Sequence, residues 1–137
     1  MQKLSEEQIK EIAEMLECGF DCYWNTKTNE LLFLPNESQT SIYDDDAWKE
    51  DRKKIKKKPK SYKCIEGMTS SESFRMMEDF AEMLPDEKLK ASLIQALNNQ
   101  KPFRHFKELI DFSDYRQNWF DYKAERFREY VREQVGD

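Results

Sequence analysis

The sequence predicts an α+β fold, in which a small three-stranded antiparallel sheet is packed by helices and followed by a four-helix C-terminal half. Glycine and proline number only three and four in 137 residues, which disfavours a many-turned β-sandwich. Short apolar runs around a polar turn occur in the first half, whereas the second half carries capping residues and apolar side chains at helical spacing. No repeat or linker interrupts this order, so we expect residues 1–137 to form a single domain.

The first predicted elements are a helix and a β-hairpin. Ser5 to Gln8 reads as a capping box, and Gly19 is placed to end the helix that the box begins. Two short strands follow, at residues 20–25 and 30–34. The polar turn between them contains Asn29, a residue type that tolerates a positive φ.

The next predicted elements are a peripheral helix and a third strand. Asp44 to Asp46 precede the helix and a basic run ends it, an order that the helix macrodipole favours. Only Trp48 and Ile55 form an apolar seam, so we expect the helix to lie outside the core. Pro59 stops it, and residues 61–66 alternate as a short strand.

Four further helices are predicted after the strands. The first opens with a capping box at Thr69 to Glu72 and carries two apolar stripes, one of which includes Met83. Such a wide apolar arc predicts a position at the centre of the core. Pro85 and Pro102 mark the starts of the next two helices, and Ser113 is expected to cap the last.

Charge and cysteine content indicate a compartment. Charged residues make up 37% of the chain, with a net charge of -5, against about 25% charged residues in average proteins. No apolar run approaches the roughly 20 residues that a membrane helix needs, and the N-terminus carries acids where a signal peptide would be apolar. The cysteine count is an odd three. We therefore predict a soluble cytoplasmic protein with free thiols and no membrane contact.

A family resemblance covers nearly the whole chain. Its motifs are, in order, Phe74-x-x-Met77-x-x-Phe80, Ala96-Leu97, Pro102-Phe103-x-x-Phe106-Lys107 and Arg116-x-x-Trp119-Phe120. In this order the sequence resembles an uncharacterised family of small bacterial proteins. The resemblance implies a single bacterial domain, and it supplies no catalytic role.

Signatures of catalysis, cofactors and metals are missing from the sequence. His105 is the single histidine, and it has no Ser or Cys at a motif spacing, so we favour a solvent-facing or capping role. The three glycines are too far apart for a nucleotide-binding loop. Cys18, Cys22 and Cys64 could join His105 in a zinc set, but no matched pair of ligand spacings supports it. We expect neither a cofactor nor a metal.

A basic run at residues 52–60 is the first candidate contact surface. It holds seven Lys or Arg in nine residues, which gives a local positive charge able to neutralise phosphates. The alternative is a solvated helix end that is balanced by the acids before it. The candidate phosphate contacts are Lys53, Lys54, Lys56, Lys57 and Lys58.

A second basic and aromatic group lies near the C-terminal half. It contains the candidate anion or partner contacts Arg104, His105, Lys107, Arg116 and Trp119. These residues could line a small anionic-ligand pocket where two helices meet. In the structural alternative, which we favour, Arg116 satisfies the C-terminal carbonyls of the helix that Pro102 opens, or pairs with Glu108 or Asp111. Lys107 then lays its stem over Phe103, and the aromatic residues belong to the core.

The leading functional hypothesis is a non-enzymatic cytoplasmic adaptor or regulatory module that binds another protein. Absence of every catalytic signature and an uneven charge distribution motivate it. The alternative is nucleic-acid binding through residues 52–60, and a third hypothesis is a small-ligand pocket near Arg104 and Trp119. The sequence leaves the oligomeric state and the identity of the partner open.

Overall fold

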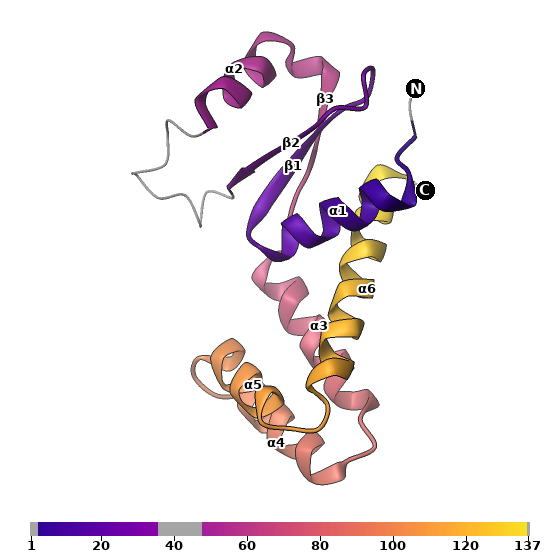
Figure 1. Ribbon diagram of the computed structural model, residues 1–137. Helices are drawn as coiled ribbons and strands as arrows, with labels where there is room; N and C mark the ends of the chain where they lie inside the picture. The colour runs from indigo at the N-terminus through magenta and orange to yellow at the C-terminus, as the bar shows by residue number, and fades with distance from the viewer. Residues whose placement is uncertain (1–2, 36–47, 137) are drawn as a thin grey trace. The chain divides into compact units, whose positions relative to one another are not determined.

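The computed structural model describes residues 3–35 and 48–136 (Figure 1). The predicted acids Asp44 to Asp46 lie outside these ranges. The described elements, in chain order, are α1 Glu6–Glu17, β1 Phe20–Asn25, β2 Leu31–Pro35, α2 Lys49–Lys57, the 3-10 helix η3 Pro59–Ser61, β3 Tyr62–Ile65, α3 Ser70–Met83, α4 Glu87–Leu97, α5 Pro102–Asp111 and α6 Arg116–Val135. This order confirms the predicted α+β class, with a three-stranded sheet and four C-terminal helices.

The chain divides into two compact units. One contains residues Met1–Gly67 and Phe127–Asp137, and the other contains Met68–Arg126. The sheet, α1, α2 and the C-terminal part of α6 therefore belong to the first unit. Helices α3, α4, α5 and the N-terminal part of α6 belong to the second.

The core of the first unit forms where α1 packs against β1. The strands are antiparallel in the order β2-β1-β3. Cys22 of β1 is paired with Ile65 of β3. Directly opposite residues point to the same face of a sheet, and both of these side chains are fully buried on that face. Ile9 and Ile12 of α1 are buried as well.

Local sequence signals of the first unit act as predicted. The Ser5 side chain accepts a hydrogen bond from the Gln8 backbone N–H, and the Gln8 side-chain oxygen accepts one from the Ser5 backbone N–H, so the capping box of α1 is complete. Gly19 has a φ of 91° after the helix end, and Asn29 has a φ of 67° at the hairpin turn. Helix α2 has no buried residue, which confirms its peripheral position.

The core of the second unit is built around aromatic rings. Trp119 of α6 lies between Phe80 of α3 and Phe106 of α5, with ring centroids 5.2 and 5.0 Å away and edge-on geometry. All three side chains are buried. Edge-to-face packing of this kind stabilises aromatic pairs beyond the area that they bury.

Two predictions about the second unit are wrong in detail. Met83 was expected in a core stripe, but its side chain is 65% exposed because the buried face of α3 runs along Met76, Phe80 and Leu84. Ser113 does not cap α6, which begins at Arg116. Its hydroxyl donates to the Ile110 carbonyl and accepts from the Tyr115 N–H, so Ser113 forms the turn between α5 and α6.

Candidate functional site

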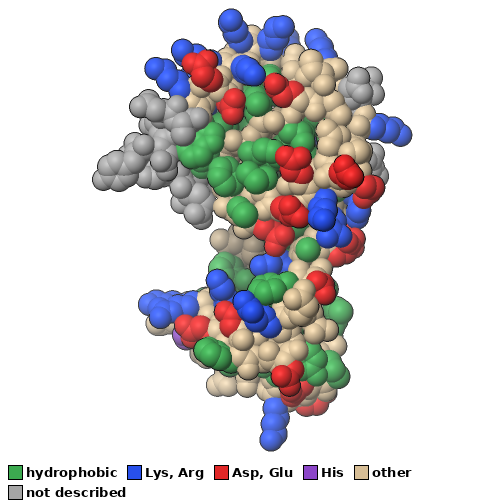
Figure 2. Space-filling model, in the orientation of Figure 1, with side chains coloured by type: hydrophobic (Ala, Val, Ile, Leu, Met, Phe, Trp, Pro, Cys, Tyr) green, Lys and Arg blue, Asp and Glu red, His purple; other side chains and the backbone are tan. Residues whose placement is uncertain are grey.

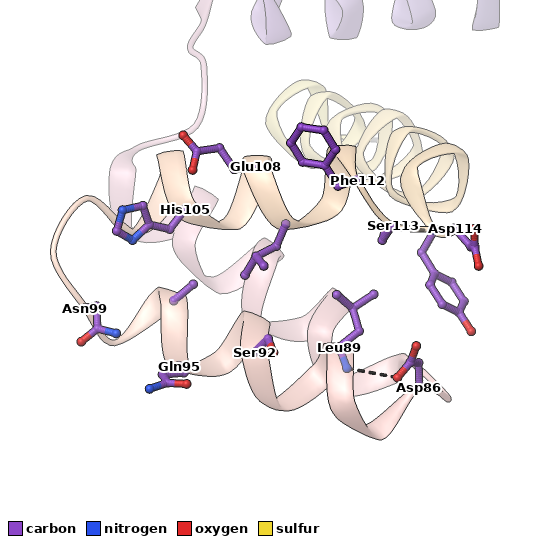
Figure 3. Close-up of a pocket in the computed structure, with 13 residues that line it drawn as sticks. Asp86, Leu89, Ser92, Gln95, Asn99, His105, Glu108, Phe112, Ser113 and Asp114 are labelled. Carbon is purple, nitrogen blue, oxygen red and sulfur yellow. Dashed lines mark hydrogen bonds between the residues drawn. The ribbon is translucent and has the colours of Figure 1, made fainter.

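An open groove lies between α4 and α5, with a volume of about 860 Å³ (Figure 3). Ligand sites of this size are common, since pockets for small molecules span roughly 300 to 1,000 Å³. The residues that line the groove are Asp86, Leu89, Ser92, Gln95, Ala96, Asn99, His105, Glu108, Leu109, Phe112, Ser113, Asp114 and Tyr115.

Helical periodicity explains which side chains reach the groove. On α5 the lining positions 105, 108, 109 and 112 follow the spacing of one helical face. The α4 positions follow the same rule from residue 89 to residue 96. Leu89 points from α4 towards α5 in Figure 3, which gives the floor of the groove an apolar character.

Two local devices hold the ends of these helices. Asp86 caps α4 by accepting a hydrogen bond of 3.1 Å from the Leu89 N–H. At the other end of the groove Lys101 takes a left-handed conformation, with a φ of 51°, directly before Pro102 begins α5. Proline at the first helical position is favourable because its missing N–H would have no partner there.

An apolar side chain stands open to solvent at the rim of this groove. Phe112 follows the last residue of α5 and is 93% exposed, the highest value among the large hydrophobic residues of the described chain. A single exposed apolar side chain is ordinary on a protein surface, but Phe112 lines the same groove as two further apolar side chains, Leu89 and Leu109. The Ser113 turn holds the backbone directly after it.

The charge of the groove is negative. Asp86, Glu108 and Asp114 are among the lining residues, and none of the thirteen described lining residues is Lys or Arg. Glu108 is paired with Arg104 at 3.2 Å, so the carboxylates of Asp86 and Asp114 carry most of the negative character, at the end of the groove opposite His105 (Figure 3).

The predicted contacts of the C-terminal half do not converge on one pocket. His105 and the partner of Arg104 line the groove, whereas Lys107 is exposed and outside the lining. Arg116 pairs with Asp111 at 3.5 Å and lies over the Phe120 ring. Trp119 is only 4% exposed and belongs to the aromatic core. These positions match the structural alternative for Arg116 and Trp119.

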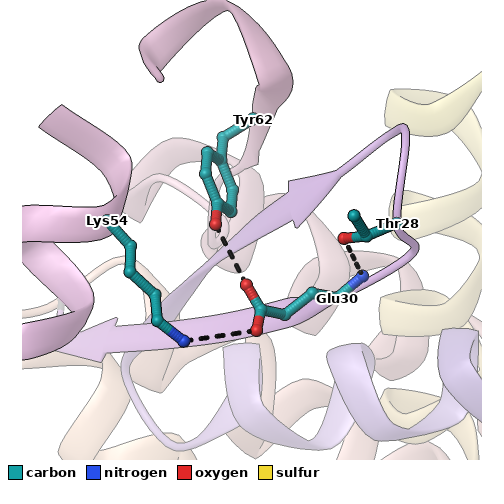
Figure 4. A network of polar contacts seen from close by, with 4 residues as sticks. All are labelled: Thr28, Glu30, Lys54 and Tyr62. Carbon is teal, nitrogen blue, oxygen red and sulfur yellow. Dashed lines mark hydrogen bonds and ion pairs between the residues drawn. The ribbon is translucent and has the colours of Figure 1, made fainter. Parts of the chain in front are cut away.

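The basic run lies on α2 and η3, where Lys and Arg side chains gather on the visible surface (Figure 2). Lys54 is drawn into a polar network: its ammonium is 3.4 Å from a Glu30 carboxylate oxygen, and Tyr62 donates to the other oxygen at 3.0 Å (Figure 4). Lys53 and Lys56 are exposed on the same helix.

Some residues of the basic run line a second hollow, which has a volume of about 460 Å³, and the others lie outside it. It is lined by Asn25, Lys27, Thr28, Lys57, Lys58, Pro59, Lys60 and Ser61. Of the five predicted phosphate contacts, only Lys57 and Lys58 line it. The structure adds Lys27, which comes from the hairpin turn, and Lys60.

Thiol chemistry is suppressed in the sheet. All three cysteines are free. Burial raises the pKa of Cys22 to about 12 and also raises the pKa of Cys64. Because the thiolate is the nucleophilic and metal-binding form, burial lowers the fraction of reactive thiolate at both positions. Among residues 3–35 and 48–136, no group of three His, Cys, Asp or Glu is placed to hold a metal ion.

The comparisons with known proteins identify a family. A model of an uncharacterised protein family, UPF0158, matches residues 4–136. The chain belongs to this family. It is also 26% identical, over 131 residues, to the UPF0158 protein PA5073 of Pseudomonas aeruginosa, an alignment that covers 94% of this chain and 80% of the relative. The predicted resemblance to an uncharacterised bacterial family is thereby confirmed.

The family description names no activity, and no solved structure matches the chain. No helix in the described part of the chain is long and apolar enough to cross a membrane.

Proposed function

We propose that this protein is a non-enzymatic cytoplasmic adaptor, and that the groove between α4 and α5 binds a basic, amphipathic segment of a partner protein. The observation that carries the proposal is Phe112, which is 93% exposed at the rim of an acidic groove. An aromatic side chain in that position supplies the type of anchor that dominates protein interfaces.

The composition of the groove specifies the partner's chemistry. Leu89, Leu109 and Phe112 offer contacts to an aliphatic or aromatic side chain. Asp86 and Asp114 offer carboxylates to Lys or Arg at one end. A helix that places apolar residues on one face and basic residues beside them meets both requirements.

A defined peptide tests the proposal without knowledge of the natural partner. The probe is a fluorescent amphipathic helix composed of Leu and Lys, and the reference is the same peptide with Glu in place of Lys. We expect the Lys peptide to bind, and Phe112→Ala to weaken it by about tenfold, the effect of a hot-spot loss of about 1.4 kcal/mol. The reference peptide is expected not to bind.

Matched variants separate the groove from the net charge of -5. Met83→Ala removes another exposed hydrophobic residue, 65% exposed and outside the lining. Asp86→Asn with Asp114→Asn removes two lining charges, and asparagine preserves the cap of α4. Glu78→Gln with Glu129→Gln removes two charges elsewhere. Equal weakening by both charge pairs, or by Met83→Ala and Phe112→Ala, would refute the groove as the site.

A second candidate function is nucleic-acid binding through residues 52–60. It is supported by the gathering of Lys and Arg over α2 and η3 (Figure 2). Replacement of Lys53, Lys54, Lys56 and Lys57 by Glu should abolish binding of a single-stranded oligonucleotide, and wild-type affinity should fall steeply with salt. Affinity that is insensitive to both changes would remove this candidate.

A further inference from the structure

The geometry points to a phosphoryl-binding site in the hollow between the hairpin turn and η3, formed by Lys27, Lys57, Lys58 and Lys60. We propose that this hollow binds phosphate groups, either of a nucleic-acid backbone or of a small phosphorylated molecule. The inference is independent of the groove between α4 and α5. It also differs from general binding by the basic run, because it depends on Lys27 and excludes Lys53, Lys54 and Lys56.

The main chain fixes the two walls of the hollow against each other. The Thr26 N–H donates to the Ser61 carbonyl at 3.0 Å, which joins the hairpin turn to η3. The Ser61 N–H donates to the Lys58 carbonyl, also at 3.0 Å. The four lysines therefore project from backbone segments that are already held in place, which lowers the ordering cost of binding.

Asn25 shapes the hairpin wall. Its side-chain oxygen accepts hydrogen bonds from the Lys27 and Thr28 N–H groups, at 3.0 and 3.1 Å. Asn25 and Ser61 are the buried polar residues of the described chain, and both line this hollow. Polar groups are costly to bury unless they are hydrogen-bonded. The hydrogen bonds of Asn25 and of the Ser61 backbone therefore fix the conformation of both walls.

The charge of the hollow favours an anion. The lining contains four lysines, and none of its eight described residues is Asp or Glu. Lysine at the end of a helix ordinarily interacts favourably with the helix dipole, which accounts for Lys57 and Lys58 at the C-terminal end of α2. It does not account for Lys27, which the hairpin brings to the same hollow from a distant part of the sequence. An anion in the hollow would relieve the mutual repulsion of the ammonium groups.

Hydrogen-bonding capacity fits phosphate. Each ammonium offers three donors and no acceptor. The Thr28 hydroxyl oxygen accepts a hydrogen bond from the Glu30 N–H at 3.3 Å, and its own hydrogen can rotate to donate to a ligand. Phosphate oxygens are acceptors throughout. The nearby Glu30 carboxylate is occupied by Lys54 and Tyr62 (Figure 4).

The test uses two probes, inorganic tripolyphosphate and a labelled oligothymidylate of about 15 nucleotides. We expect tripolyphosphate to displace the oligonucleotide. If three phosphates are contacted, the affinity of the single strand should fall about 20-fold between about 50 and 200 mM salt. Oligonucleotide affinity that far exceeds the tripolyphosphate affinity indicates a nucleic-acid backbone as the ligand, and similar affinities indicate a small phosphorylated molecule.

Two double variants with equal charge loss decide whether the hollow is the site. Lys27→Gln with Lys60→Gln alters the lining, and Lys53→Gln with Lys56→Gln alters exposed positions of α2 outside it. The lining pair should weaken both probes about tenfold or more, and the outer pair less than about threefold. Equal losses would overturn the hollow while leaving general nucleic-acid binding by the run intact. Absence of binding by either probe would overturn both.

Discussion

Replacement of Trp119 by alanine should strongly destabilise the protein, because the side chain is a core residue of the second unit. Only 4% of Trp119 is exposed, and its ring packs edge-on against Phe80 and Phe106. Removal of a buried tryptophan costs about 3 to 5 kcal/mol, from lost burial and the cavity that remains. Since folded proteins are stable by about 5 to 15 kcal/mol, this change removes a large share of the total.

The measurement is denaturant unfolding followed by far-ultraviolet circular dichroism, together with a thermal melt. We expect the Trp119→Ala melting temperature to fall by about 10 °C or more, whereas Trp119→Phe, which retains a ring, should lose less than half as much free energy of unfolding. Phe112→Ala serves as the matched control, because its 93% exposed ring contributes within about 0.5 kcal/mol. Unchanged melting of Trp119→Ala would refute the core assignment and return this residue to the candidate contacts.

Three further predictions follow from local structure. Thr69→Ala removes the capping oxygen that accepts from the Glu72 N–H and should lower the free energy of unfolding by about 1 kcal/mol in denaturant melts, with Thr69→Ser retaining it. Cys22, whose pKa burial raises from 9.0 to about 12, should react with iodoacetamide far more slowly than an ordinary thiol, because little thiolate forms and the side chain is fully buried. Its contribution to stability should be complete below pH 9 and decline between pH 9 and 12. A melting temperature that rises over that interval would contradict this sign. Arg104→Gln breaks an exposed ion pair with Glu108 and should leave the melting temperature within about 2 °C.

The elements were predictable because their signals are local. A capping box needs only residues three positions apart, and Thr69 and Glu72 form theirs as the sequence indicates. The same holds for the hairpin turn, where Asn29 supplies the positive φ. The error at Met83 arose because a wide apolar arc does not specify which side of a helix meets its neighbours. That choice is made by the packing of α3 against α4 and α6.

The groove and the hollow were not predictable to the same degree, because each joins separate segments. The spacing of the apolar residues along α5 contained one clue to the groove. Phe106 and Ile110 share its buried face, and Phe112, two positions later, falls about 200° around the helix axis. Its exposure could have been derived from this spacing. No comparable signal placed Lys27 beside Lys60, since their proximity depends on the pairing of β1 with β3.

The two proposed sites require opposite experiments because their charges are opposite. Salt weakens any exposed electrostatic contact, so salt dependence alone would not distinguish a basic peptide in the groove from phosphate in the hollow. The sign of the probe does. A Lys-rich peptide should be sensitive to Asp86 and Asp114 and indifferent to Lys27, whereas tripolyphosphate should show the reverse. A net charge of -5 favours basic probes over anionic ones for the chain as a whole, so phosphate binding that depends on Lys27 would come from a local concentration of positive charge.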